Sequence, residues 1–290
     1  MVRSRIRSPR RCAQQGVPNN AVFGTAQQRA VVGGNPDLDA ETAKVFTAGI
    51  VIEPPAVKGL SFTLDYFNIK ISNAIQALGA QVILANCYTR DQDDACNQIH
   101  RDPQLAGAID FVDDPVSNVG GTTTDGVDFA LAYDHKQGGA GHFHHQFEGQ
   151  ILHKYTLDNT IQLLQGVGYY DLGVYPRLKA NFSTTWDLKP IDAGINVRYI
   201  GGYKECQDND CNTPENLEMY SRTVDLNVTG DLFVGYTQKS KVGTTRFTVG
   251  VNNITDHKPS LIYIGFAGDS DASTYDYMGR YVYARLSQLF

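Results

Sequence analysis

The feature that most constrains this chain is a regular alternation of apolar and polar side chains in segments of about ten residues. In residues 178–188, for example, the even-numbered side chains are mainly apolar, including Phe182 and Trp186, and the odd-numbered ones are polar. Successive side chains of an extended strand point to opposite faces, so this segment predicts a strand with one apolar face. Comparable segments predict about nine strands, the first spanning about Ala43–Glu53. The others lie near residues 60–66, 127–134, 143–151, 178–188, 191–199, 224–236, 246–252 and 281–290.

The length of these segments and the spacing between them favour a membrane protein. Several could run to ten or more residues, whereas strands of soluble proteins mostly have ~5–6. A tilted strand needs ~9–11 residues to cross a bilayer. The connections are alternately short and long, as in outer-membrane barrels, which have short periplasmic turns and long extracellular loops. We therefore expect an all-β fold, an antiparallel transmembrane β-barrel, with a soluble carbohydrate-binding β-sandwich as an alternative.

Composition narrows the choice of function. No run approaches the ~20 apolar residues of a membrane-spanning helix, although barrel strands hide their hydrophobicity in such averages. The net charge of -6 argues against a nucleic-acid partner. The first eleven residues carry five arginines and no apolar core, so they are not a secretory signal peptide. A basic nucleic-acid-binding arm is the alternative to our expectation that the chain begins partway through a larger protein.

The five cysteines predict two local disulfides in an oxidising compartment, Cys87–Cys96 and Cys206–Cys211. Both pairs lie in segments expected to be polar loops. Cys12 is left over, as expected if its partner lies in sequence outside this chain. Zinc binding is the alternative, but the spacings lack a CxxC pattern and no histidine lies close to the second pair.

No group of residues forms a catalytic constellation, so we expect neither an enzyme nor a cofactor. Two polar groups could hold a metal, but their ordinary interpretation is a polar strand start and a solvated acidic loop, and we predict no metal site. They are His142, His144 and His145, and Asp91, Asp93 and Asp94. Loops on a rigid scaffold commonly carry binding residues. The aromatic candidates for ligand contact are Tyr169, Tyr170 and Tyr175, whose alternative role is that of interfacial aromatics.

The last ten residues predict a closing strand. Its apolar face carries Val282, Leu286 and the terminal Phe290, and Gln288 interrupts that face near its end. We interpret Phe290 as a signal for barrel assembly rather than for ligand binding.

Several motifs resemble, in order, the C-terminal part of TonB-dependent outer-membrane receptors. Residues 35–42, NPDLDAET, resemble the Asn-Pro-x-Leu-x-x-Glu segment of that family, and LDYFNI at 64–69 resembles the strand that follows it. Asn118-Val119-Gly120 with DGVD at 125–128 resembles a third segment, and VNNITD at 251–256 and residues 279–290 resemble the ending. The family usually has an aromatic residue two positions before its terminal Phe, where this chain has Gln288, which weakens the expected assembly signal.

The resemblance implies a 22-stranded barrel with a plugged lumen, of which this chain would supply about nine C-terminal strands. Residues 1–42 would be a loop remnant and the motif leading into the first strand, and residues 43–290 the C-terminal part of the barrel. Such receptors of the bacterial outer membrane import scarce nutrients, commonly ferric siderophores. The implied partners are an extracellular nutrient ligand, outer-membrane lipid, the barrel assembly machinery, and TonB through an upstream region. A passive porin, which has a similar barrel, is the other functional alternative.

Overall fold

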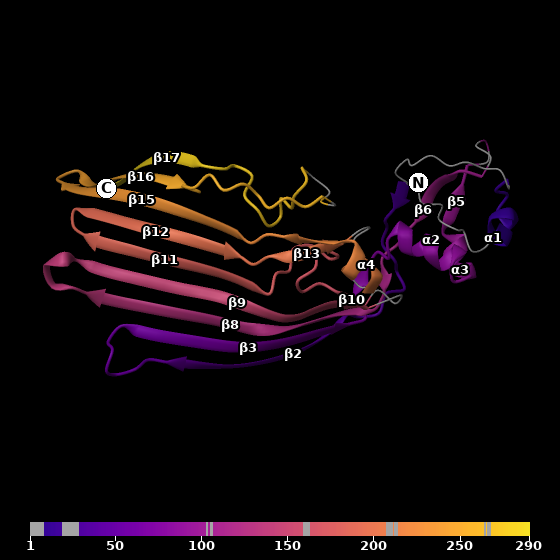
Figure 1. Ribbon diagram of the computed structural model, residues 1–290, viewed down its shortest axis with the longest axis horizontal. Coiled ribbons are helices and arrows are strands. Elements are labelled where there is room, and N and C mark those ends of the chain that lie inside the picture. The colour runs from indigo at the N-terminus through magenta and orange to yellow at the C-terminus, as the bar shows by residue number, and fades with distance from the viewer. Residues whose placement is uncertain are drawn as a thin grey trace. The chain divides into compact units, whose positions relative to one another are not determined.

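The computed structural model describes residues 9–18, 29–102, 104, 107–158, 163–206, 211, 214–263, 265 and 268–290. Its main element is a ten-stranded sheet in which chain order is also spatial order (Figure 1). The continuous path comprises β2 (Thr42–Ile52), β3 (Leu60–Ser72), β8 (Gly121–Lys136), β9 (His142–Asp158), β11 (Leu178–Leu188), β12 (Ile191–Ile200), β15 (Asn227–Ser240), β16 (Gly243–Asn252) and β17 (Tyr281–Leu289). The short β10 (Leu163–Gln165) pairs with β9. The predicted set of about nine strands is confirmed.

The connections follow the predicted alternation. Short turns join β2 to β3, β8 to β9, β11 to β12 and β15 to β16 at one end of the sheet (Figure 1). The turn between β8 and β9 contains the short helix η1 (Gly138–Ala140). At the other end, long segments join β3 to β8, β9 to β11, β12 to β15 and β16 to β17. We refer to the two ends as the turn end and the loop end.

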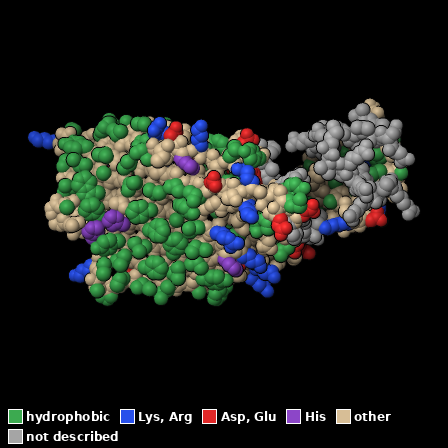
Figure 2. All heavy atoms as spheres, viewed as in Figure 1, with side chains coloured by type: hydrophobic (Ala, Val, Ile, Leu, Met, Phe, Trp, Pro, Cys, Tyr) green, Lys and Arg blue, Asp and Glu red, His purple; other side chains and the backbone are tan. Residues whose placement is uncertain are grey.

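The register gives the sheet one apolar and one polar face. Phe182 of β11 lies between Phe147 of β9 and Val197 of β12, whereas its neighbour Ser183 lies between Gln146 and Asn196. Figure 2 shows a surface with hydrophobic side chains spread over the whole sheet. These side chains are exposed, with Val234 at 55% and Leu286 at 72%. Soluble proteins rarely leave so large an apolar surface in water, and such a surface is typical of a membrane-facing one.

The sheet has two edge strands and does not close into a barrel within the described residues. Strands β2 and β17 occupy the two edges, and no described strand pairs with their outer sides. The expectation of a partial barrel is therefore confirmed. An unpaired edge leaves a row of backbone N–H and C=O groups without partners.

Strand lengths differ from the sequence interpretation in the middle of the chain. β3 continues to Ser72, and β8 begins at Gly121 instead of near Val127. The extra residues of β8 include three consecutive threonines, which do not alternate in polarity but are β-branched and suit an extended backbone. The insertion between the two strands is correspondingly shorter than predicted.

That insertion packs with the N-terminal segment into a compact unit of its own, residues 1–43, 71–122 and 158–163. Its elements are α1 (Pro9–Gln14), β1 (Arg29–Val31), β4 (Ile75–Gln76), α2 (Ala80–Tyr88), α3 (Asp93–Asn97), β5 (Ile99–Arg101), β6 (Ile109–Asp113) and β7 (Ser117–Asn118). Residues 74–84, which the sequence left open between helix and strand, contain both β4 and the start of α2. Residues 1–8, most of the arginine-rich start, lie outside the described residues.

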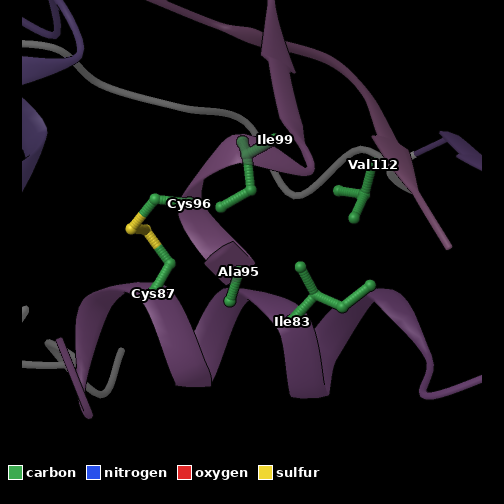
Figure 3. Packing of buried hydrophobic residues seen from close by; sticks show 6 residues of the cluster. All are labelled: Ile83, Cys87, Ala95, Cys96, Ile99 and Val112. Atoms are coloured by element: carbon green, nitrogen blue, oxygen red, sulfur yellow. A yellow bond between two sulfur atoms is a disulfide. The ribbon is translucent and has the colours of Figure 1, made fainter. Parts of the chain in front are cut away.

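A small core and a disulfide hold this unit together (Figure 3). Ile83 of α2 and Val112 of β6 are both fully buried. Cys87 is bonded to Cys96, with an S–S distance of 2.15 Å, and links α2 to α3. Cys12 forms no disulfide. No helix in the described part of the chain is long and apolar enough to cross a membrane.

The remaining loops belong to the same compact unit as the sheet. They contain the hairpin of β13 (Tyr203–Cys206) and β14 (Ser221–Val224), together with α4 (Pro214–Met219). Cys206 at the end of β13 is bonded to Cys211, with an S–S distance of 2.03 Å. Asp171 binds this loop, because its Oδ2 accepts a 2.8 Å hydrogen bond from the Cys211 backbone N–H.

Candidate functional site

On the polar face of the sheet, an ion pair connects neighbouring strands. Arg198 of β12 donates to both carboxylate oxygens of Asp231 on β15, at 2.5 and 3.1 Å. The backbone N–H of Asn253, just after β16, donates to Asp231 Oδ1 at 2.9 Å. Three neighbouring strands therefore meet at one carboxylate near the loop end.

A hollow of about 560 Å³ lies beside this network. Its charged lining residues are Asp65, Asp128, Glu148, Lys179 and Arg198. The acidic residues come from β3, β8 and β9, and the basic ones from β11 and β12. Apolar side chains, among them Phe129 and Ile200, also line the hollow, so it combines charged groups with apolar surface.

The histidines near the β8–β9 turn do not converge on one point. His144 Nδ1 lies 2.8 Å and His142 Nε2 3.5 Å from Asp134 Oδ1. His145 belongs to the opposite face, where its Nδ1 lies 2.9 Å from Thr184 Oγ1. In the described residues no three metal-ligating side chains gather.

The acidic loop of the insertion binds a cation from the same chain. Arg11 of α1 forms ion pairs with Asp91 and Asp93, and its Nη2 donates to the Asp91 carbonyl oxygen at 2.8 Å. These carboxylates therefore have an arginine partner, which fits a structural role for the loop.

A cluster of tyrosines lies at the loop end of the sheet. Tyr203 and Tyr275 are buried, with exposures of 3% and 5%, and their hydroxyl oxygens are 3.1 Å apart in a hydrogen bond. The Tyr170 ring stacks at 6.2 Å from Tyr203, and its hydroxyl donates to Asp271 Oδ2 at 3.4 Å. Burial, the largest cause, raises the pKa of Tyr203 well above its ordinary value. These phenols stay neutral at physiological pH.

The three tyrosines predicted as ligand contacts lie in three different environments. Tyr170 belongs to the cluster just described. Tyr175 stacks on Tyr155 with 4.1 Å between ring centroids, and burial followed by the Tyr155 hydrogen bond raises the pKa of Tyr175 to about 12. Tyr169 instead lines a separate pocket with Arg177 and Lys204. Whether any of them contacts a ligand stays a prediction.

Sequence reasoning missed the buried partners of this cluster, Tyr203 and Tyr275. They are 72 residues apart in the chain; Tyr203 begins the short strand β13, and Tyr275 lies in the long segment before β17. No local pattern distinguishes a buried loop tyrosine from an exposed one.

The last residues of the chain include the terminal Phe290 and the polar Gln288. Phe290 follows the last residue of β17 and is 98% exposed. Gln288 accepts a 2.5 Å hydrogen bond from Thr245 Oγ1 on β16, across the strand pair. The polar side chain that interrupts the apolar face therefore has a partner on the neighbouring strand.

Comparisons with known proteins agree with this architecture. Residues 9–254 match the family described as TonB dependent receptor-like, beta-barrel. No curated protein sequence matches the chain.

Similar solved structures include a mutant of the Pseudomonas aeruginosa ferric enterobactin receptor PfeA in complex with enterobactin, at TM-score 0.59 and 19% identity, covering 88% of this chain and 32% of that one. The FrpB iron transporter of Neisseria meningitidis has TM-score 0.53 and 14% identity, covering 89% and 31%. The siderophore receptor PirA of Acinetobacter baumannii has TM-score 0.52 and 18% identity, covering 89% and 33%.

The chain thus spans about a third of the length of these structures. Identities this low establish a shared fold. The family match covers most of the sequence, and its motifs, strand order and alternating connections agree with it. The chain belongs to the TonB-dependent receptor β-barrel family.

Proposed function

We propose that this chain forms part of an outer-membrane receptor that takes up a scarce nutrient, such as a ferric siderophore, with energy supplied through TonB. The observation that carries the proposal is the sheet itself, with one exposed apolar face, one charged face, and loops gathered at one end. Members of the family are transport receptors, and the similar structures include two receptors for siderophores.

In this proposal the apolar face contacts outer-membrane lipid and the polar face lines the lumen. The turn end faces the periplasm and the loop end faces outward, following the usual arrangement of bacterial barrels. The two disulfides then lie on the outer side, where cysteines are oxidised. Assembly by the barrel machinery would close the edges of β2 and β17 with further strands, since open edges in lipid leave backbone groups unsatisfied.

The loop-end tyrosines are the proposed ligand contacts. Tyr169, Tyr170 and Tyr175 contribute flat aromatic rings, which suit an aromatic ligand. The charged hollow of the polar face lies in the lumen, where a plug would contact it.

Two alternative functions are distinguished by specific features. A soluble β-sandwich packs its apolar face against a second sheet, and no described sheet covers this one. A passive porin has a similar barrel but needs neither TonB nor a plug, so energy dependence separates it from a receptor.

The test is uptake in a Gram-negative strain that lacks its own siderophore receptors and expresses the complete receptor of which this chain forms part. We expect growth on ferric enterobactin as sole iron source, and loss of that growth when tonB is deleted. An otherwise identical strain carrying an empty vector is the control. Uptake that persists without TonB would favour the porin, and absence of uptake with several ferric siderophores would refute the proposed ligand class.

A further inference from the structure

Three cysteines lie in the compact unit formed by the N-terminal segment and the insertion. Cys12 of α1 carries a thiol, and Cys87 of α2 is bonded to Cys96 of α3. Figure 3 shows this disulfide beside the small core of the unit. It is shielded from solvent, because Cys87 is fully buried and Cys96 is 9% exposed, whereas Cys12 is partly exposed. The disulfide is therefore more open to a thiol of its own unit than to one in solution.

Two residues that flank Cys12 contact the two bonded sulfurs. Arg11 Nη1 donates to Cys96 Sγ at 3.8 Å, and Gln15 Nε2 donates to Cys87 Sγ at 3.8 Å. The Gln15 N–H donates to the Arg11 carbonyl at 3.1 Å, so the helical geometry of α1 continues through Gln15 and places both residues on one side. Residues three apart are also neighbours on a helix. Cys12 therefore lies beside Gln15, at the Cys87 end of the disulfide.

The environment of Tyr88 supports this position for the Cys12 thiol. Tyr88 follows Cys87 directly in α2, and its hydroxyl donates a hydrogen bond to Gln15 Oε1. Burial is the largest cause that raises the pKa of Tyr88, and charge on Cys12 raises it further. The charge of Cys12 acts on Tyr88 only because the two side chains are close together. The thiol thus lies near the end of α2 that carries Cys87.

The contacts give the two bonded sulfurs different roles. Cys87 Sγ contacts Gln15, the helical neighbour of Cys12, whereas Cys96 Sγ contacts the guanidinium of Arg11. Two aspartate ion pairs hold that guanidinium in place. A neighbouring cation stabilises a thiolate, and a thiol of lower pKa is the faster leaving group. These contacts favour attack on Cys87 with departure of Cys96.

We propose that Cys12 exchanges with this disulfide, so that the unit has two alternative linkages, Cys87–Cys96 and Cys12–Cys87. Cys12 gives its proton to water, and its thiolate attacks Cys87 Sγ. The bond from Cys87 to Cys96 breaks, and Cys96 leaves as a thiolate that takes up a proton. One disulfide replaces another, so the step consumes no oxidant or reductant.

The exchange changes how α1 is attached to the rest of the unit. With the Cys87–Cys96 linkage, α1 is held by the hydrogen bonds and ion pairs of Arg11 and Gln15. With the Cys12–Cys87 linkage, α1 is joined covalently to α2, and α3 is released from its covalent link to α2. The freedom of the segment that carries α1 therefore depends on which disulfide is present. This inference concerns the compact unit alone and is separate from the transport function.

The test maps the disulfides of the complete receptor of which this chain forms part. Thiols of the native protein are blocked with N-ethylmaleimide without added reductant, the sample is quenched in acid, and its peptides are identified by mass spectrometry. We expect label on Cys12 in some molecules and on Cys96 in the others, together with a Cys12–Cys87 peptide. Cys12→Ser should lose the Cys96 label and keep the Cys87–Cys96 bond. The Cys206–Cys211 pair is the internal control and should have one linkage in every sample.

Two serine variants test which sulfur is attacked. In oxidised glutathione, Cys96→Ser should form the Cys12–Cys87 bond, whereas Cys87→Ser should form little Cys12–Cys96 bond. Label confined to Cys12 in the wild type would overturn the inference, and this measurement needs no variant to fold. A disulfide from Cys12 to a cysteine outside this chain, or equal bond formation in the two variants, would also contradict it.

Discussion

The carboxylate of Asp231 joins three strands, and its removal gives the sharpest test of the fold. Arg198 binds it through two hydrogen bonds and the Asn253 N–H through a third. Asp231→Asn keeps the shape of the side chain but removes its charge. Hydrogen bonds to charged groups contribute ~1.5–3 kcal/mol. Because the Arg198 side chain is 43% exposed, solvent screens the pair, and we expect a loss at the lower end, about 1–2 kcal/mol.

The measurement is urea unfolding of the 290-residue chain refolded in detergent micelles, followed by fluorescence of Trp186, the single tryptophan of this chain. A double-mutant cycle with Arg198→Gln isolates the pair, with an expected coupling of about 1 kcal/mol. Asp187→Asn is the matched control, because Asp187 lies on the same face and has no ion pair among the described residues. Coupling below about 0.3 kcal/mol would mean that the two sites act independently and would refute the reasoning.

Four further predictions follow from the same structure. Deleting Phe290, which follows the last residue of β17 and is almost fully exposed, should lower the amount of receptor in the outer membrane while ligand affinity of the inserted protein is unchanged; surface labelling and binding assays measure the two. Non-reducing peptide mapping should recover both disulfides, and free thiols at all four positions would contradict this. The 290-residue chain by itself should not form a transporting barrel, because its sheet has two open edges, and ligand uptake into liposomes containing only this chain would refute that prediction. Tyr175 should ionise near pH 12 instead of about 10, so the stability it contributes is complete below about pH 10 and is lost as the pH rises toward 12; absorbance titration of Tyr175→Phe should show the loss of one tyrosine's amplitude near pH 12 relative to the wild type.

The strands and their faces could be predicted from the sequence because the two-residue period of a strand is a local property. Phe182 and Ser183 follow each other in the chain and necessarily point to opposite sides. The alternation of short and long connections is also visible in the sequence. Lys189 and Pro190 form a short turn, and a long segment precedes Tyr281. The family motifs occur in the family's order along the chain, so the sequence also predicted the family and, with it, the fold.

Contacts between segments that are far apart in the sequence decided the environments of the loop side chains. The sequence grouped Tyr169, Tyr170 and Tyr175 by proximity, but the fold directs them to a pocket with Arg177 and Lys204, a cluster with Tyr203, and the ring of Tyr155. Arg11 meets Asp91 across 80 residues, which no spacing rule relates. Alternation fixes which face a strand residue takes, whereas a loop side chain has no repeating backbone geometry to orient it, so its environment depends on which other loops pack against it in the tertiary structure.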